Sequence, residues 1–181
     1  MRVVSLFSGA GGLDLGFKLA GNDIVWANDI DKDACATYRE NIGDHIVCED
    51  IKDIDIASIP AADIVIGGFP CQGFSLANLR RSIDDERNQL YKFFYSVIKT
   101  LKPKFFVAEN VKGILSLGGG SVIKQIEADF QEAGYITSVN LVNMADYGVP
   151  QTRQRVIIIG QRKDISDEFV VSLPKKTNCK V

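Results

Sequence analysis

The sequence has little histidine and no clustered cysteine. His45 is the single histidine among 181 residues. The four cysteines are widely separated, at Cys35, Cys48, Cys71 and Cys179. A zinc site needs several of these side chains at short spacing, so the sequence predicts no metal site. A hydrolase that pairs a cysteine nucleophile with a histidine base is also disfavoured, because His45 leads into the apolar pair Ile46-Val47 and is expected to be structural.

Long apolar runs and a strong charge of either sign are also missing. No run approaches the roughly 20 apolar residues of a membrane span, and the formal net charge is only −2. With 46% hydrophobic and 24% charged residues, the composition is typical of one globular domain with a sizeable core. No secretion signal precedes Val3-Val4, so we expect free thiols in a reducing compartment, the cytoplasm. Any contact with nucleic acid then depends on local clusters such as Arg80-Arg81 and Arg153-x-Arg155.

The sequence does contain a regular alternation of two patterns. Short runs of β-branched and aromatic residues predict buried strands at Val3–Phe7, Ile24–Ala27, Ile64–Ile66, Phe105–Ala108, Thr137–Val142 and Val156–Ile159. Helical spacing of apolar residues predicts helices over Leu13–Leu19, after Asp31 as a cap, over Leu90–Leu101 and over Val122–Ala133. Because the strands are apolar throughout, we predict a doubly wound α/β fold whose mostly parallel sheet is covered on both faces.

In such a fold, ligands bind beyond the carboxyl ends of the strands. The most unusual polar segments of this sequence follow the predicted strands, at Ser8–Gly12, Asn28-Asp29, Asp50, Pro70–Gln72 and Glu109-Asn110. We therefore expect one edge of the sheet to hold a functional site.

The glycine-rich turn FSGAGG, residues 7–12, lies between a predicted strand and a helix. Its glycines allow the backbone to approach a ligand at the helix N-terminus. Asp29, at the end of the next strand, is suited to accept hydrogen bonds from ribose hydroxyls. Asp14 stands where a dinucleotide motif has its third glycine, which favours a nucleoside without a pyrophosphate. The alternatives are a turn needed only for packing, and an Asp50 that is a turn residue rather than an adenine contact.

Three other features suggest chemistry, and each has a structural alternative. Cys71 leaves a buried strand behind a proline in GGFPCQGFS, although a lone cysteine is most often a small core residue. Glu109 follows an apolar strand, where a carboxyl is suited to proton donation, or else is a cap or an ion-pair partner. Gln151, Arg153 and Arg155 alternate, so an extended segment turns all three to one side, toward phosphates, a base carbonyl or water.

With these residues assembled, the chain resembles the cytosine-C5 DNA methyltransferases of bacterial modification systems. The resemblance runs from about Val3 to Gln161 through the ordered blocks LFSGAGGLDLGF, ANDIDK, GGFPCQGFS, DERNQLY, AENVKG and DYGVPQTRQR. It implies a Rossmann-like methyltransferase domain over residues 1–161 that binds S-adenosylmethionine. Residues 162–181 are then a tail or the start of a target-recognition domain.

The resemblance implies cofactor contacts around the glycine turn and the strand ends. The matching positions are Phe7, Ser8, Gly9, Ala10, Gly11, Gly12, Leu13, Asp29, Ile30, Asp50, Ile51, Phe69, Pro70 and Leu90. Two residues depart from the family's usual pattern. Ile30 replaces a common aromatic, which weakens stacking on the adenine, and Ser5 replaces a common Asp.

The resemblance also implies catalytic roles. Cys71 would add through its thiolate to C6 of a cytosine, and Glu109 would hold N3 and the exocyclic amine. Arg155 would contact O2 of the base, with Arg153 near O2 or a phosphate. The other implied substrate contacts are Pro70, Gln72, Ser75, Asn110, Val111 and Gln151.

Members of this family continue beyond the QTRQR block into a target-recognition domain and a terminal segment that this sequence lacks. We therefore expect a truncated form or one subunit of a split enzyme that a second polypeptide completes. The expected partner is double-stranded DNA with the target base flipped out, in a bacterial restriction-modification system. A non-catalytic cofactor-binding module and a tRNA methyltransferase are the alternatives.

Overall fold

The computed structural model describes residues 1–70, 89–166 and 168–177. These residues belong to two compact units. The N-terminal unit comprises Met1–Phe69 and Gln89–Val107, and the C-terminal unit comprises Pro70–Asn88 and Ala108–Val181. Strand β5 (Phe105–Val111) begins in the first unit and ends in the second.

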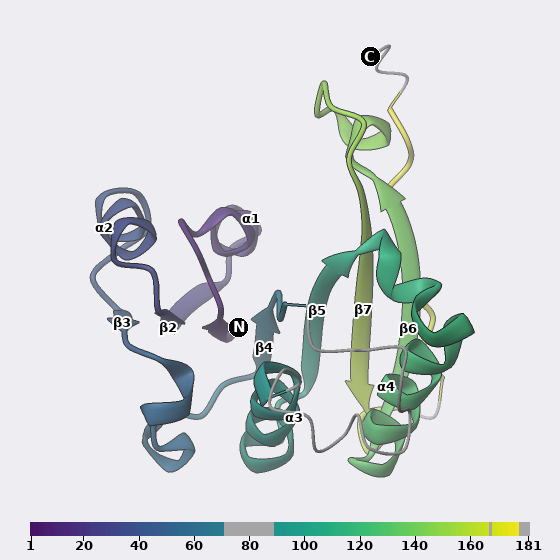
Figure 1. Ribbon diagram of the computed structural model, residues 1–181, viewed down its shortest axis with the longest axis horizontal. Helices are drawn as coiled ribbons and strands as arrows, with labels where there is room; N and C mark the ends of the chain where they lie inside the picture. Colours follow the sequence, from purple (N-terminus) through teal and green to yellow (C-terminus); the bar gives the residue numbers. More distant parts are fainter. Residues whose placement is uncertain (71–88, 167, 178–181) are drawn as a thin grey trace. The chain divides into compact units, whose positions relative to one another are not determined.

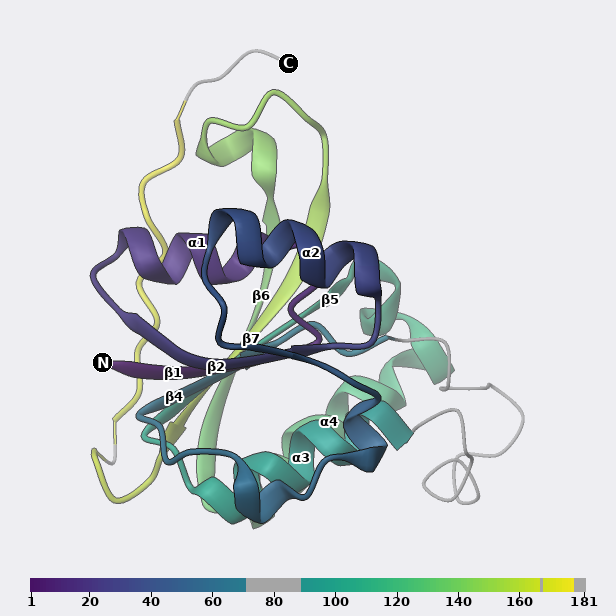
Figure 2. The same cartoon turned by 90° about the vertical axis from the view of Figure 1, so that its left-hand side faces the viewer.

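The N-terminal unit alternates strands and helices. Its elements are β1 (Arg2–Leu6), α1 (Gly12–Leu19), β2 (Asp23–Asp29), α2 (Lys32–Asn41), β3 (Ile46–Cys48), the 3₁₀ turns η1 (Ile51–Asp53) and η2 (Ile56–Ser58), β4 (Ile64–Gly67), α3 (Gln89–Leu101) and the start of β5. Strand β1 pairs in parallel with β2 and with β4, and β2 pairs in parallel with β3. Helices α1 and α2 lie on one face of these strands, and α3 lies on the other (Figures 1 and 2).

Continuous apolar burial explains this layering. Strand β1 is buried from Val3 to Leu6, as expected for a parallel strand with both faces covered. One core cluster contains Val3, Ile24, Ile64 and Ile66, with Leu13 and Phe17 of α1 packed against it. A second contains Ala27, Cys35, Tyr38, Ile42 and Ile46. The predicted cap of α2 is confirmed, because the Asp31 side chain accepts hydrogen bonds from the backbone N–H groups of Asp33 and Ala34.

The C-terminal unit is built on a long antiparallel hairpin. Its elements are the end of β5, the 3₁₀ turns η5 (Lys112–Leu115) and η6 (Leu117–Gly120), α4 (Ser121–Glu132), β6 (Tyr135–Asn143), η7 (Met144–Tyr147) and β7 (Gln154–Arg162). Strands β6 and β7 pair from Tyr135 opposite Arg162 to Asn143 opposite Gln154, and α4 packs against β6. The predicted strands 137–142 and 156–159 are too short. Several of the added residues, such as Asn143, Gln154 and Arg162, are polar and lack an apolar pattern, although they pair across the hairpin.

The strand order is β3-β2-β1-β4-β5-β7-β6. The ladders that join β1, β2, β3 and β4 are parallel, and the β6–β7 hairpin is antiparallel. The predicted α/β fold with a mostly parallel sheet is thus confirmed.

The domain division expected at residue 161 stays a prediction. Within the C-terminal unit, residues near the end of the described tail contact η7. The Thr177 backbone N–H donates to the carbonyl oxygen of Asp146 at 2.6 Å, and the Lys176 Nζ lies 2.7 Å from an Asp146 carboxylate oxygen.

Over residues 1–70, 89–166 and 168–177, no helix combines the length and apolar character needed to cross a membrane. In the same ranges, no three His, Cys, Asp or Glu side chains gather closely enough to hold a metal ion. Cys35 and Cys48 are free thiols.

Gly67 at the end of β4 is expected to tolerate no side chain. A Cβ there would lie 2.7 Å from the Leu6 carbonyl oxygen and 3.1 Å from the Phe94 ring. We expect Gly67→Ala to lower the free energy of unfolding by about 1–3 kcal/mol, measured by urea denaturation.

Gly16→Ala is the matched control for Gly67→Ala. Gly16 lies in α1, and a Cβ there would meet nothing within 4 Å. Because alanine favours the helix over glycine by up to about 1 kcal/mol, this change should be neutral or stabilising. Equal effects of the two substitutions would contradict the packing described for β4.

Candidate functional site

The glycine turn leaves β1 through three residues in the left-handed region of backbone space. These are Phe7, Gly9 and Gly11, with φ of 55°, 54° and 88°. Glycine adopts this conformation without strain, whereas a bulky residue such as phenylalanine does so rarely. The Ser8 backbone N–H donates to the Asn28 carbonyl oxygen at 3.0 Å, which ties the turn to the end of β2.

Asp29, the last residue of the neighbouring strand β2, is hydrogen-bonded to this turn. Its Oδ2 accepts a hydrogen bond from the Gly9 backbone N–H at 2.7 Å, and its Oδ1 accepts one from the Asp31 backbone N–H at 2.9 Å. Each carboxylate oxygen has a second lone pair, so Asp29 can also accept hydrogen bonds from a ligand. The sequence-predicted partnership of the glycine turn and Asp29 is therefore a direct contact.

The outer side of the turn is open. A Cβ at Gly9 or at Gly12 would meet no atom within 4 Å. At Gly12, which has an ordinary φ, neither the backbone nor a neighbouring atom requires glycine. The space that this residue leaves free is therefore available to a ligand. Ile30, beside Asp29, exposes 64% of its surface.

The other expected cofactor positions differ in exposure. Asp50 is a half-buried N-cap that accepts a hydrogen bond from the Lys52 backbone N–H and forms an ion pair with the Lys52 Nζ at 3.7 Å. Ile51 and Phe69 are buried, and the Phe69 ring packs on Tyr91 and Phe94, at centroid distances of 5.3 and 5.6 Å. The remaining positions are intermediate or exposed: Phe7, Ser8, Ala10, Leu13, Leu90 and, in the C-terminal unit, Pro70.

In the C-terminal unit, the expected acid and one expected arginine form an ion pair. The Arg155 Nε lies 2.7 Å from the Glu109 Oε1, and both side chains are largely shielded from water, with 19% and 32% exposed. Strands β5 and β7 bring these residues together. The Arg155 Nη1 also donates to the Gln154 carbonyl oxygen at 2.9 Å, which limits the motion of the guanidinium.

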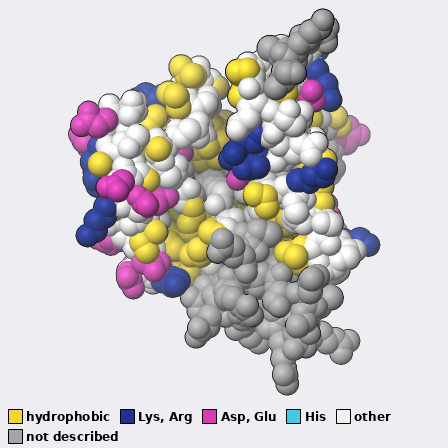
Figure 3. All heavy atoms as spheres, turned by 45° about the horizontal axis from the view of Figure 1, so that its top comes forward, with side chains coloured by type: hydrophobic (Ala, Val, Ile, Leu, Met, Phe, Trp, Pro, Cys, Tyr) yellow, Lys and Arg dark blue, Asp and Glu magenta, His cyan; other side chains and the backbone are white. Residues whose placement is uncertain are grey.

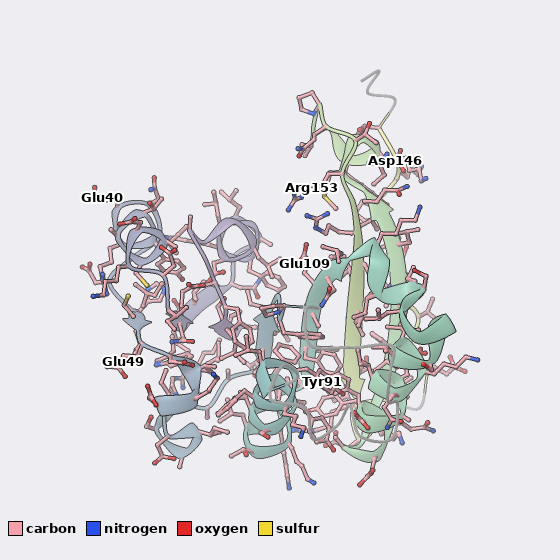
Figure 4. The ribbon with its side chains drawn as sticks, in the orientation of Figure 1. Glu40, Glu49, Tyr91, Glu109, Asp146 and Arg153 are labelled. Atoms are coloured by element: carbon pink, nitrogen blue, oxygen red, sulfur yellow. The ribbon has the colours of Figure 1, made fainter. Side chains whose placement is uncertain are left out.

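The other predicted substrate residues of this unit lie around that pair. Arg153 lies toward the hairpin tip from Glu109 (Figure 4). Strand β7 begins at Gln154, so Gln151 and Arg153 are exposed residues of the segment just before it. The Met144 backbone N–H donates to the Arg153 carbonyl oxygen at 2.9 Å, and the expectation that Gln151, Arg153 and Arg155 lie on one side stays a prediction.

Asn110 is buried, and its Oδ1 accepts a hydrogen bond from the backbone N–H of the exposed Val111. Cys71, Gln72 and Ser75 lie outside the described residues. In the space-filling view, Lys and Arg side chains are exposed over the β6–β7 hairpin (Figure 3).

Sequence reasoning treated Asp14 only as the replacement of a third glycine and missed its contacts. The carboxylate is fully buried, with hydrogen bonds from the Ser5 Oγ at 2.9 Å and the Tyr38 hydroxyl at 2.8 Å. The His45 Nε2 lies 3.0 Å from the same hydroxyl. An acidic residue on the otherwise apolar face of α1 was the signal that could have indicated a buried polar network.

The comparisons with known proteins agree on one family. The model of the C-5 cytosine-specific DNA methylase family matches residues 1–180. The type II methyltransferase M.NgoFVII of Neisseria gonorrhoeae is 49% identical over 93% of this chain and 46% of its own length. M.BspRI of Lysinibacillus sphaericus is 46% identical over 98% of this chain and 48% of its own length. The chain thus spans about half the length of these curated relatives.

Solved structures show the same fold. A prophage-encoded protein of Escherichia coli, assigned as a DNA modification methyltransferase, matches with a TM-score of 0.76 and 36% identity over 91% of this chain and 47% of that chain. The Dnmt2 methyltransferase of S. pombe has a TM-score of 0.73 over 90% of this chain and 49% of its own. At 23% identity, the second likeness concerns the fold alone.

His45 is expected to make stability depend on pH. Burial, the largest cause, lowers the pKa of His45 from 6.5; Lys18 acts in the same direction, whereas Asp14, Asp23 and Asp44 oppose it. Below about pH 6.5 the unfolded chain therefore binds a proton that the folded chain resists. The free energy of unfolding contributed by His45 is present above that pH and is lost on acidification toward the lower folded-state pKa.

This dependence can be measured by urea denaturation at about pH 7.5 and pH 5.5. We expect the stability of His45→Gln to fall less between these pH values than that of the unsubstituted chain, because glutamine keeps a donor but does not titrate. Burial raises the pKa of Asp14, so the contribution of Asp14 to stability increases on acidification. Asp14 is present in both proteins, so the comparison between them reports on His45. An equal loss in the two proteins would contradict this role of His45.

Proposed function

Because the chain belongs to the family of C-5 cytosine-specific DNA methylases, we propose that it carries the cofactor-binding and catalytic part of a DNA (cytosine-5-)-methyltransferase. The proposed enzyme transfers a methyl group from S-adenosylmethionine to C5 of a cytosine in double-stranded DNA. The observation that carries the proposal is the Glu109–Arg155 ion pair, which joins two expected catalytic residues from separate strands.

The residues of the glycine turn fit S-adenosylmethionine, which would supply an electrophilic methyl group. Asp29 retains acceptor capacity for the ribose hydroxyls, and Gly9 and Gly12 leave space for a ligand against the backbone. The other residues proposed to hold the cofactor are Phe7, Ser8, Ala10, Gly11, Leu13, Ile30, Asp50, Ile51, Phe69, Pro70 and Leu90.

The proposed role of Cys71 follows from the chemistry of cytosine. C5 of the free base is too electron-poor to attack an electrophilic methyl group. A bond from the Cys71 thiolate to C6 converts the ring into an enamine whose C5 is nucleophilic. Once C5 carries the methyl group, it loses its proton to a base, and the electrons of that C–H bond restore the ring double bond as the Cys71–C6 bond breaks. The thiolate is regenerated.

Glu109 and Arg155 are proposed to hold the base during this addition. Glu109 would contact N3 and the exocyclic amine, and Arg155 would contact O2. Their ion pair supports these roles, because it orients the carboxylate before a base arrives. Arg153 would contact O2 or a phosphate, and the other proposed substrate contacts are Pro70, Gln72, Ser75, Asn110, Val111 and Gln151.

The base must leave the duplex to reach such groups. The exposed Lys and Arg side chains over the β6–β7 hairpin are suited to the DNA backbone, which positions a duplex without identifying its sequence (Figure 3). Because the relatives are about twice as long, we propose that a further polypeptide segment or a second chain completes the enzyme. The family description favours DNA over tRNA as the substrate. A bacterial restriction-modification system in the cytoplasm fits the type II relatives.

A covalent trap tests the proposed nucleophile. Duplex DNA that contains 5-fluorocytosine blocks the final elimination, because C5 then carries fluorine in place of the proton. With S-adenosylmethionine and a complementing C-terminal half from a relative, we expect a covalent protein–DNA complex on a denaturing gel. The chain alone is expected to bind the cofactor weakly and to form little or no complex.

Cys71→Ser should abolish this complex, and Cys48→Ser is the matched control. Cys48 is a free, half-buried thiol of the N-terminal unit that has no role in the proposed chemistry. The proposal fails if the complex persists in Cys71→Ser, or if no complementing half yields a complex with the unsubstituted chain.

Substitutions on β5 and β7 test the ion pair. We expect Glu109→Gln to lower kcat of the complemented enzyme by about 10²-fold or more, since it removes the charged partner of the base. Arg155→Lys keeps the positive charge but loses the planar guanidinium, so kcat should fall by about tenfold or more.

Arg162→Lys is the control for Arg155→Lys, because Arg162 lies on the same strand and pairs with the exposed Asp164. Its kcat should stay within about twofold of the unsubstituted enzyme, since exposed ion pairs contribute little. Equal rates for the two lysine variants would remove Arg155 from the mechanism.

A further inference from the structure

We propose that Tyr38 and Asp14 are positioning residues for the cofactor turn, which they hold in its binding conformation without contacting the cofactor. The inference rests on the proposed binding of S-adenosylmethionine at this turn. It concerns residues that the sequence resemblance leaves without a role.

Asp14 connects the two ends of the turn. Ser5, on β1 just before the turn, donates its hydroxyl to Asp14 Oδ2 at 2.9 Å. Asp14 itself lies in the first turn of α1, just after the glycine turn. Both residues are buried, so this hydrogen bond is shielded from competing water. A single carboxylate thus fixes the distance between the end of the strand and the start of the helix.

Tyr38 contacts the turn through its ring, at Gly11, and contacts the start of α1 through its hydroxyl, at Asp14. A Cβ built at Gly11 would lie 2.9 Å from the Tyr38 Cδ2 and 2.7 Å from the Ile42 Cγ1, so the Gly11 backbone lies directly on these α2 side chains. The Tyr38 hydroxyl donates to Asp14 Oδ1 at 2.8 Å. The turn is therefore held against α2 by packing at Gly11 and by a hydrogen bond at Asp14.

His45 completes the network. The Tyr38 hydroxyl has one proton, which it donates to Asp14 Oδ1, so it is left to accept from His45 through Nε2–H at 3.0 Å. The two rings meet edge to face, with centroids 5.5 Å apart. This arrangement assigns the Nε2–H tautomer to His45 and fixes the Tyr38 hydroxyl toward Asp14.

The buried network of Asp14, Tyr38 and His45 costs free energy that an apolar core would not, and it lies directly beside the proposed cofactor turn. Burying a carboxylate without a cationic partner is unfavourable, and an apolar trio of similar volume would stabilise the fold at least as well. The same network accounts for Ser5, where the family commonly has Asp. An Asp at that position would bring a second carboxylate against buried Asp14, whereas the serine hydroxyl donates to it.

Tyr38→Phe tests the proposal with a minimal change. It removes the hydroxyl but keeps the ring that supports Gly11. We expect the Kd for S-adenosylmethionine, measured by calorimetry on the full chain well below its melting temperature, to rise by about five- to tenfold. Asp14→Asn should raise this Kd less than Asp14→Ala does, because the asparagine amide can accept a hydrogen bond from Tyr38 and donate one to Ser5.

Tyr135→Phe is the matched control. Tyr135 is a buried tyrosine on β6, in the C-terminal unit. Removing the Tyr135 hydroxyl should lower the melting temperature and change the Kd for S-adenosylmethionine by less than twofold. Tyr38→Phe should change both quantities. If Tyr38→Phe lowers only the melting temperature and leaves Kd unchanged, the network is merely structural and the positioning role is overturned.

Amide hydrogen exchange separates this inference from the proposed function. In the positioning model, the backbone N–H groups of Gly9 and Gly11 exchange several-fold faster in Tyr38→Phe than in the unsubstituted chain, with or without cofactor. If the unsubstituted chain binds no S-adenosylmethionine, the proposed cofactor site fails, and exchange alone decides whether Tyr38 holds the turn. Unchanged exchange at both glycines would overturn the inference.

Discussion

Strand β1 forms parallel ladders with β2 on one side and β4 on the other, and it is buried from Val3 to Leu6. Parallel pairing requires that neighbouring strands end at the same edge. The glycine turn and Asp29 therefore meet directly, with the Gly9 N–H donating to the Asp29 carboxylate. The cofactor chemistry proposed for this unit depends on that shared edge, because residues 20 positions apart in the sequence become hydrogen-bonded neighbours.

Much of this arrangement could be predicted from the sequence. The continuous apolar runs indicated parallel strands with both faces covered, Asp31 indicated the start of α2, and the glycine turn indicated a ligand beside Asp29. These signals are local, since each depends on a few neighbouring residues. The hairpin lengths were underestimated, because several outer residues of β6 and β7, such as Asn143, Gln154 and Arg162, are polar although they pair across the hairpin.

The contacts that sequence reasoning missed are tertiary. Asp14, Tyr38 and His45 come from separate segments, and no spacing rule connects them. The pairing of Glu109 with Arg155 is of the same kind: each residue was predicted for its own role, but their contact requires the register of β5 and β7. Gln151 and Arg153 precede the start of β7 at Gln154, so their expected alignment with Arg155 on one side stays a prediction.

Phe7 has a consequence for how this turn evolves. Its φ of 55° costs a bulky L-residue about 1–2 kcal/mol, and glycine or asparagine would relieve much of that strain. Selection for stability alone would therefore favour glycine or asparagine over phenylalanine at this position. A lineage that kept this fold but no longer used the turn to bind a ligand is expected to lose the phenylalanine early.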